Sequence, residues 1–436
     1  MPPSPAADPP SGAGGLDVRP FRALTYRQHD PADLARVSSP AYDLVTAAGR
    51  NRLAAADPHN IVRLILPHVE RAGGERTDAA MVGPGSAETA AGTLRDWLDQ
   101  GVLDRDALPA LWRYEMAAPG SGPTTGWLGA VGLPRSGSSA VLPHEDTFAP
   151  AVEGRRALLA ATHTDLEPIV LAHDPDDEVT ALTVATGASA PTLQVADPDG
   201  VTHRLWRVTD PAVLDRLVRA LAGTRAVIAD GHHRFAAARE HQRSGHVDSG
   251  AVLSLVTPMG PGGLQVRAIH RVVPDLALDT ALATAADGFQ VSDRTPADGD
   301  VVAVVDRWTT TGGRVGFLVT DGTRVAELTS PAPAVLDAIP AEAPTAWRGL
   351  DVVLAHHGLF GRLWGRRDDP ASVLVAHDVA EALQLGRERA GVAVLLHSPS
   401  PADVAAVARA GARMPRKSTL FVPKPRTGLV LRPHGG

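Results

Sequence analysis

Residues 226–240 read AVIADGHHRFAAARE, and the rest of the chain is interpreted around them. Residues 226–229 form a short apolar run that is typical of a buried strand, and Asp230 and Gly231 form a turn signal. The Ala, Arg and Glu content from 232 to 242 predicts a helix. The stretch therefore predicts a strand, a tight turn and a helix, with the polar residues Asp230, His232, His233 and Arg234 at the junction.

The predicted junction is suited to holding an anion. The first turn of a helix exposes unpaired N–H groups and the positive end of the helix dipole. Arg234 adds a bidentate donor for phosphate or carboxylate, and Asp230 with two imidazoles can handle protons or a metal. A purely structural explanation fits the same residues, because Asp-Gly is a common turn, Asp is a common N-cap, and a histidine pair in a first turn can be solvated.

Composition narrows the class of protein. The chain has 436 residues, 44% hydrophobic and 21% charged, as expected for a soluble protein of two or three domains. A net charge of −7 argues against a chain built broadly to bind nucleic acid. Without cysteine there is no disulfide, zinc–thiolate site or thiol nucleophile. Residues 1–17 are expected to be a disordered tail rather than a signal peptide, and the absence of a membrane-spanning run predicts a cytoplasmic protein.

Lysine is rare in this chain. Only Lys417 and Lys424 occur among 42 basic residues, and both lie in MPRKSTLFVPKPRTGLVLRP at 414–433. Lysine is a compact point charge suited to a phosphate oxygen, whereas arginine is a broad planar fork. The segment therefore predicts phosphate contacts from Lys417, Ser418 and Thr419, although two residues can also cluster by chance. Because no Gly-rich loop precedes the Lys-Ser-Thr triplet, it is not a Walker A motif.

Three further stretches carry polar residues beside apolar runs. His144 and Glu145 lie in VLPHEDTF at 141–148, where paired carboxylates beside an imidazole suit acid–base work or Mg²⁺, or simply cap the helix expected at 155–162. Tyr42 belongs to SPAYD at 39–43. His270 and Arg271 occupy a predicted strand, VRAIHRVV, at 266–273, so at most one of them lines a given site.

The remaining pattern predicts a mixed α/β or α+β chain. Residues 18–275 are expected to form one unit, and 276–436 a second α/β unit that ends in a hairpin around 425–428. Residues 60–67 (NIVRLILP) are predicted to be a strand. The strand at 251–258 is expected to pair beside the one at 226–230.

Several phrases together resemble a large bacterial family known only as a domain of unknown function, number 1015. They are PFRAL near residue 20, SPAYD, LPHEDT, IADGHHR, AIHRVV and MPRKSTLFVPKPRTGLVLRP, so the resemblance covers nearly the whole chain after residue 17. Two departures stand out. VRAIHR replaces a pattern that often has a proline, and AVEGRR has Arg155 and Arg156 where a lysine usually precedes the arginine.

The central turn is also similar to the nucleotide-binding turn of the ParB/sulfiredoxin fold, which includes CTP-binding partition proteins and kinases of free serine. This resemblance implies a ParB/sulfiredoxin-like core in which His233 and Arg234 hold nucleotide phosphates and Asp230 takes part in the reaction. A glutamate acts on the substrate hydroxyl in the serine kinases. Glu145 is the candidate for that role here, without a motif that assigns it.

Three functions follow as hypotheses. The first is a kinase that transfers phosphate from ATP or ADP (or CTP), with Mg²⁺ held by Asp230 and Glu145, to a small hydroxylated metabolite such as a free amino acid. Lys424, Tyr42, His144, His270 and Arg271 would contact substrate or support the site. The second is a nucleotide-binding switch without phosphotransfer. The third is a metal-dependent hydrolase using the histidines. No membrane or nucleic-acid partner is expected, and the acceptor and the oligomeric state stay open.

Overall fold

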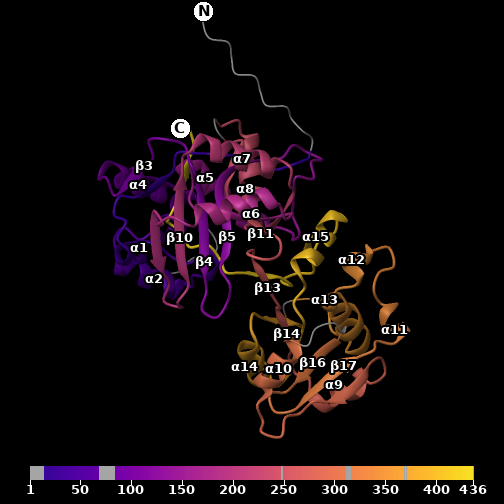
Figure 1. The fold of residues 1–436 in the computed structure, drawn as a ribbon. Coiled ribbons are helices and arrows are strands. Elements are labelled where there is room, and N and C mark those ends of the chain that lie inside the picture. The colour runs from indigo at the N-terminus through magenta and orange to yellow at the C-terminus, as the bar shows by residue number, and fades with distance from the viewer. Residues whose placement is uncertain are drawn as a thin grey trace, which may run out of the picture. The chain divides into compact units, whose positions relative to one another are not determined.

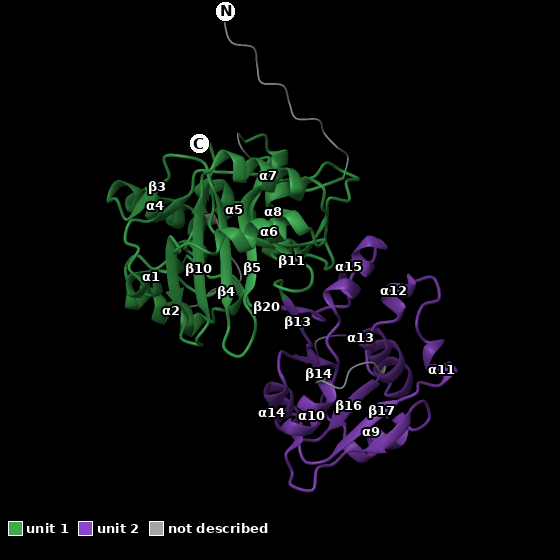
Figure 2. Cartoon of the chain, in the orientation of Figure 1, with its two compact units in different colours: residues 1–264, 423–436 green, residues 265–422 purple. Residues whose placement is uncertain are grey.

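The computed structural model describes residues 14–67, 84–246, 249–310, 316–367, 369 and 371–435, so most of the expected tail at 1–17 lies outside the described residues. The chain divides into two compact units (Figure 2). The first comprises residues 1–264 and 423–436, and the second comprises residues 265–422. The fold is α+β, as the sequence predicts.

The division differs from the predicted one in two ways. The boundary falls after Leu264 rather than after 275, at the end of the Gly/Pro-rich stretch that follows the strand at 251–258. The last 14 residues, Pro423–Gly436, also return to the first unit. They do so through backbone pairing with remote segments, Ser39 with Thr427 and Leu24 with Leu431. No local pattern reveals such a return, because its partners lie some 400 residues earlier.

The first unit is built on a mixed sheet of nine strands in the described chain, in the order β6-β11-β8-β12-β5-β4-β10-β9, with β1 also paired to β5 (Figure 1). Short pairs β2–β3 and β7–β21 accompany it. The strands of this unit are β1 Val18–Arg19, β2 Leu24–Tyr26, β3 Leu103–Arg105, β4 Leu111–Ala117, β5 Thr124–Gly132, β6 Val141–Leu142, β7 Thr164–Asp165, β8 Ile169–His173, β9 Leu193–Ala196, β10 Thr202–Val208, β11 Ala226–Asp230, β12 Ala251–Pro258 and β21 Arg432–Pro433.

Helices α5 and α8 pack against each other, as do α4 with α5 and α6 with α7. The apolar faces of α5, α6, α7 and α8 join the strands in one core, which includes Leu159 of α5, Phe235 of α8 and Ile228 of β11. The helical segments of this unit are α1 Pro31–Val37, η1 Tyr42–Leu44, α2 Ala47–Ala56, α3 Val62–Ile65, α4 Pro84–Asp99, α5 Ala149–Thr162, α6 Asp177–Thr186, α7 Pro211–Ala222 and α8 His232–Arg243.

Two sequence predictions in this unit were wrong. The apolar run at 60–67 is not a strand, because Val62–Ile65 forms helix α3, and the side chain of Asn60 accepts a hydrogen bond from the N–H of Val62. A short run of apolar residues that is buried on every side carries no periodicity to distinguish the two. The strand at 251–258 is not adjacent to β11 either, since β8 lies between them and pairs with both.

The second unit contains a six-stranded sheet in the order β15-β17-β16-β19-β14-β18, in which every described pair is antiparallel. A separate pair, β13–β20, accompanies this sheet. The strands of the second unit are β13 Gln265–Arg267, β14 His270–Val273, β15 Gln290–Asp293, β16 Gly316–Thr320, β17 Val325–Thr329, β18 Leu374–Ala376, β19 Val392–Leu395 and β20 Leu420–Val422. Its helical segments are α9 Leu278–Ala285, α10 Val301–Thr310, α11 Pro333–Leu336, α12 Thr345–Arg348, α13 Asp351–Leu354, η2 Ala355–Leu363, α14 Val379–Glu388 and α15 Pro401–Arg409.

The expected C-terminal hairpin is not formed. Strand β20 pairs with β13 in the second unit, whereas β21 pairs with β7 in the first. The chain passes from the second unit to the first between Val422 and Pro423, and the residues at 425–428, already in the first unit, do not close a hairpin. Turn chemistry identified the bend but not the partners of the strands that flank it.

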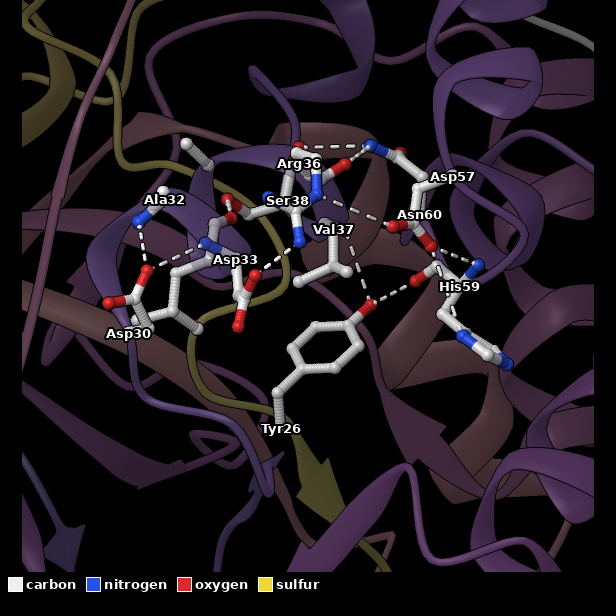
Figure 3. Close-up of polar contacts among 12 residues, drawn as sticks. Tyr26, Asp30, Ala32, Asp33, Arg36, Val37, Ser38, Asp57, His59 and Asn60 are labelled. Atoms are coloured by element: carbon white, nitrogen blue, oxygen red, sulfur yellow. Dashed lines mark hydrogen bonds and ion pairs between the residues drawn. The ribbon is translucent and has the colours of Figure 1, made fainter.

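Arg426 anchors the returning segment inside the first unit. Its side chain is 5% exposed and ion-paired with Asp197, and it donates to the hydroxyl of Ser38 at 2.7 Å and to the carbonyl of Ala35 at 3.0 Å. Figure 3 shows the polar network on the other side of Ser38, in which the Asn60 amide donates to the carbonyls of Arg36 and Ser38. The segment that leads to η1 is thereby held from both sides.

Replacing Arg426 by glutamine should lower the free energy of unfolding by about 3 kcal/mol, because Asp197 keeps only His203 as a partner and the guanidinium contacts with Ser38 and Ala35 are lost. Urea unfolding followed by circular dichroism measures the change. Arg219→Gln removes an exposed arginine paired with Asp215 on α7 and should change stability by less than about 0.5 kcal/mol. Equal stability of the two variants would show that Arg426 is not an anchor.

Candidate functional site

The turn between β11 and α8 has the conformation that only glycine adopts easily. Gly231 has φ of +92°, and a Cβ there would lie 2.8 Å from Cγ2 of Ile169 at the start of β8. β11 ends at Asp230, and α8 begins at His232. The chain therefore reverses within a single residue, which brings the Asp230 carboxylate and the first turn of α8 to the same place.

Asp230 is the centre of a charged cluster. One carboxylate oxygen accepts from the Lys424 ammonium at 2.8 Å, and the other accepts from the Arg234 guanidinium at 2.6 Å. Lys424 also forms an ion pair with Asp43, next to Tyr42 in η1. Burial by itself would raise the pKa of Asp230, but the two cations more than offset this effect and lower the pKa to about 2. The carboxylate is therefore ionised at neutral pH.

Lys424 is held in the charged form by the same contacts. Its side chain is only 10% exposed, and this burial opposes the charge. The carboxylates of Asp230 and Asp43 outweigh that effect and raise the pKa of the ammonium. One of the two lysines in the chain thus lies at the predicted turn.

The ring of Tyr42 lies beside two guanidinium groups. Arg155 of α5 stacks over the ring, with its Cζ 3.9 Å from the ring centroid, and the Cζ of Arg234 is 5.5 Å from the same centroid. Glu167 fixes the backbone of this loop, because its carboxylate accepts from the N–H of Tyr42 at 3.1 Å and from the Thr427 hydroxyl at 2.7 Å. Burial is the main reason that the pKa of Arg155 is lowered, and the nearby positive charge of Arg234 adds to it.

The loop after β6 packs on the start of α8. β6 runs parallel to β11, with Leu142 opposite Val227, so Glu145 and Asp230 both follow their strands at the same edge of the sheet. The N–H of His144 donates to Nε2 of His232 at 3.3 Å, and the N–H of Phe148 donates to Nε2 of His233 at 3.0 Å. The structure thus brings two stretches that the sequence singled out to one edge.

These backbone contacts bear on the idea of a histidine metal centre. A metal needs the lone pair of a ring nitrogen, and in His232 and His233 the lone pair of Nε2 accepts a backbone N–H instead. In the part of the chain that the structure describes, no group of three or more His, Asp or Glu side chains is arranged to hold a metal ion.

The described residues also contain no helix of the length and apolar character that crossing a bilayer requires.

The other predicted site residues belong to the second unit. Arg271 is buried and donates to Nε2 of His356 at 2.9 Å and to the carbonyl of Arg416 at 3.0 Å. His270 is also buried, and its Nδ1 accepts from the N–H of Leu396, while desolvation lowers its pKa to about 4. The hydroxyl of Ser418 donates to the carbonyl of Pro415 at 2.6 Å. Lys417 and Thr419 flank Ser418, and their expected contact with phosphate stays a prediction.

Sequence reasoning did not select Asp43, Arg155 or Glu167 as site residues. Asp43 was part of the quoted SPAYD phrase, and Arg155 was noted only as a substitute for a lysine. Glu167 is the instructive omission, because a glutamate between Leu166 and the Pro168 that precedes an apolar strand is a signal for a buried carboxylate with a partner. Only the contacts of Glu167 with Tyr42 and Thr427 reveal that partner.

Gly231→Ala should destabilise the protein by about 2–4 kcal/mol, since the new methyl group both meets Ile169 and forces an alanine into the left-handed region. Gly245→Ala is the matched control, because Gly245 also has positive φ, +75°, but has nothing within 4 Å of the added Cβ. It should cost about 1–2 kcal/mol. Thermal unfolding of both variants separates steric contact from backbone strain. An equal loss of stability in the two variants would contradict a steric clash between the added methyl group and Ile169.

The low pKa of Asp230 predicts a specific pH dependence. Because its pKa in the folded protein lies below the ordinary value of 3.8, the carboxylate stabilises the fold above that value and loses this contribution as the pH falls towards 2. Wild type should exceed Asp230→Asn by about 2 kcal/mol at pH 6, and the difference should shrink below about pH 4. Urea unfolding across that range tests this. Asp215→Asn is the control, because it changes an exposed carboxylate on α7. A pH-dependent stability difference of the same size in this variant would contradict the assignment of the effect to Asp230.

Comparison with known proteins finds solved structures that are remotely similar to this chain and one family whose model matches it. A free serine kinase in complex with AMP is 13% identical, with 65% of this chain and 84% of that chain covered and a TM-score of 0.31. SbnI with C-terminal truncation from Staphylococcus aureus is 11% identical, with 68% and 82% covered and a TM-score of 0.33. A conserved hypothetical protein from Pyrococcus furiosus is 14% identical, with 65% and 87% covered and a TM-score of 0.30.

No curated protein sequence matches the chain. A family model, by contrast, matches residues 18–353, which include η1, the loop after β6 and the β11–α8 turn. The lysine-containing C-terminal segment lies beyond the matched range. The chain belongs to the family DUF1015, described as a protein of unknown function.

Proposed function

We propose that the first unit binds a nucleoside phosphate at the start of α8 and transfers its terminal phosphoryl group to the hydroxyl of a small metabolite. One observation carries the proposal: the cationic groups of Lys424, Arg234 and Arg155 come from separate segments and gather where α8 exposes its first N–H groups. Phosphoryl transfer demands little covalent chemistry from a protein and depends mainly on such a phosphate-binding arrangement.

ATP or ADP is the proposed donor, with CTP as the alternative nucleotide. Gly231, His232 and Arg234 would hold phosphate oxygens through backbone N–H groups and the guanidinium. Lys424 would contribute a point charge, and Lys417, Ser418 and Thr419 stay proposed phosphate contacts. The ParB/sulfiredoxin-like character of the core is likewise part of the proposal.

The two carboxylates at this edge of the sheet suit different roles. A carboxylate with a pKa near 2 is a weak base, so Asp230 is better suited to holding a cation than to accepting a proton. Glu145, at the same edge, is the proposed proton acceptor, with His233 supporting the loop between them. Mg²⁺ commonly takes one or two carboxylates together with substrate phosphates, so Asp230 would serve as its protein ligand without a larger cluster, and Glu145 would become a second ligand only if it did not accept the proton. The ion would neutralise charge on the phosphates.

The acceptor oxygen forms a bond to the terminal phosphorus, and the bond from that phosphorus to its bridging oxygen breaks. The hydroxyl proton passes to the Glu145 carboxylate. The products are the phosphorylated metabolite and a nucleotide with one phosphate fewer.

Calorimetric titration of the full chain with ATP, ADP and CTP, with and without Mg²⁺, tests the proposal. Arg234→Ala should weaken nucleotide binding at least about tenfold, through loss of a charge-assisted contact. Arg243→Ala, at the far end of α8 and paired with Glu240, should not change binding. The absence of binding by every nucleotide would overturn the proposal.

The two lysine variants locate the phosphate further. Lys424→Gln should weaken binding, and a parallel loss in Lys417→Gln would support the proposed phosphate contact of Lys417. Phosphorus NMR of the protein with nucleotide and hydroxylated acceptors then distinguishes a kinase from a switch. Binding without a new phosphate ester would favour a nucleotide-binding switch over the kinase.

A further inference from the structure

A small cavity lies beside the β11–α8 turn, within the first unit. Its volume is about 50 Å³, and two guanidinium groups line it, from Arg155 of α5 and Arg234 of α8. The other lining residues are mostly apolar and come from five segments: Ile65, Leu158, Leu159, Thr164, Asp165, Leu166, Glu167, Ala237 and Val252. We call it the arginine cavity.

Each of the two arginines has one buried N–H group without a partner among the described residues, Nη2 of Arg155 and Nε of Arg234. Other nitrogens of the two groups are paired, since Arg155 donates through Nη1 to the carbonyl of Ile65 at 2.9 Å, and Arg234 donates to Asp230 and to the carbonyl of Pro168. Arg155 is only 6% exposed. Buried donors are almost always paired in folded proteins, so two unpaired guanidinium donors on one cavity indicate a ligand that accepts from both.

Two carboxylates line the cavity, and the hydrogen bonds that they accept come from groups other than the two arginines. Asp165 accepts from Arg432 at 2.7 Å and from the N–H of Leu253 at 2.8 Å, and Glu167 accepts from Tyr42 and Thr427 through one oxygen. Glu167 attracts both guanidinium groups electrostatically, but no partner within hydrogen-bond distance is found among the described residues for Nη2 of Arg155 or Nε of Arg234. An anionic ligand fits this balance.

The size and walls of the cavity select the kind of anion. A volume of 50 Å³ corresponds to roughly three to five water positions, which excludes a nucleotide. Apolar walls such as Leu158 and Val252 accept aliphatic carbon but give nothing to the extra oxygens of a phosphate. A carboxylate matches two guanidinium donors with its two oxygens.

We propose that the arginine cavity binds the carboxylate of a small organic acid, which accepts hydrogen bonds from Nη2 of Arg155 and Nε of Arg234. Because Arg234 also contacts Asp230, the bound acid lies next to the turn. A short acid that carries a hydroxyl is then the acceptor for phosphoryl transfer. This last assignment rests on the proposed function, whereas the binding of the carboxylate does not.

The test uses the full chain without nucleotide, titrated with acetate, with glycolate and with acetamide, the neutral analogue of acetate. Acetate and glycolate should raise the midpoint of thermal unfolding in a saturable way, and acetamide should not. Arg155→Gln should weaken the binding of both acids at least tenfold. Arg156→Gln is the matched control, because this adjacent arginine is paired with Glu153 outside the cavity and should leave binding unchanged.

A second variant guards against a folding defect in Arg155→Gln. Ala237→Val keeps both arginines and fills part of the cavity from α8, so it should also abolish binding while the protein unfolds cooperatively. Equal binding of acetate by wild type and both variants would overturn the proposal, as would equal binding of acetamide. Binding of inorganic phosphate in place of the acids would overturn the carboxylate assignment.

The two proposals fail separately. Nucleotide titration of Ala237→Val, which keeps both arginines and changes only the cavity wall, reports on the phosphate site alone. Loss of acid binding with intact nucleotide binding leaves the proposed function standing. Acid binding without any nucleotide binding would support the carboxylate site in the arginine cavity. It would rule out the acid as the acceptor of a phosphoryl group.

Discussion

The contact on which the site depends is the ammonium of Lys424 between the carboxylates of Asp43 and Asp230. An ion that is largely removed from water must be paired, because its desolvation is costly. Here one side chain from the end of the protein pairs with two remote carboxylates. The contact joins η1, the β11–α8 turn and the returning C-terminal segment, so none of the three can move far without exposing or unpairing a charge.

The same constraint shapes the surroundings of that contact. Arg426, two residues beyond Lys424, is buried against Asp197 and Ser38, and Thr427 donates to Glu167. These contacts are structural, but they determine where the side chains of the proposed binding site lie. Arg155 and Arg234 each keep one buried nitrogen without an acceptor among the described residues, and such an unpaired donor costs stability unless a ligand accepts from it.

Local pattern was sufficient for some of the architecture. The apolar run, the Asp-Gly turn and the helix-forming residues after it specified β11, Gly231 and α8 with near-correct bounds, because each depends on neighbouring residues. The run at 60–67 was mistaken for a strand, since full burial removes the periodicity that separates the two structures. The order of β11, β8 and β12 also could not be inferred, because pairing between strands depends on contacts far apart in the chain.

The amino-acid sequence by itself determined that this chain has an α+β fold, a glycine-dependent turn at 230–231 and a concentration of charged side chains there. It also singled out Lys424 through the scarcity of lysine. Only the tertiary structure decided that Lys424 and Lys417 belong to different units, and that Arg155 and Glu167 join the turn. The physical reason is that charges are paired by distance in space, and the partners of Asp230 and Glu167 come from segments that no local rule connects.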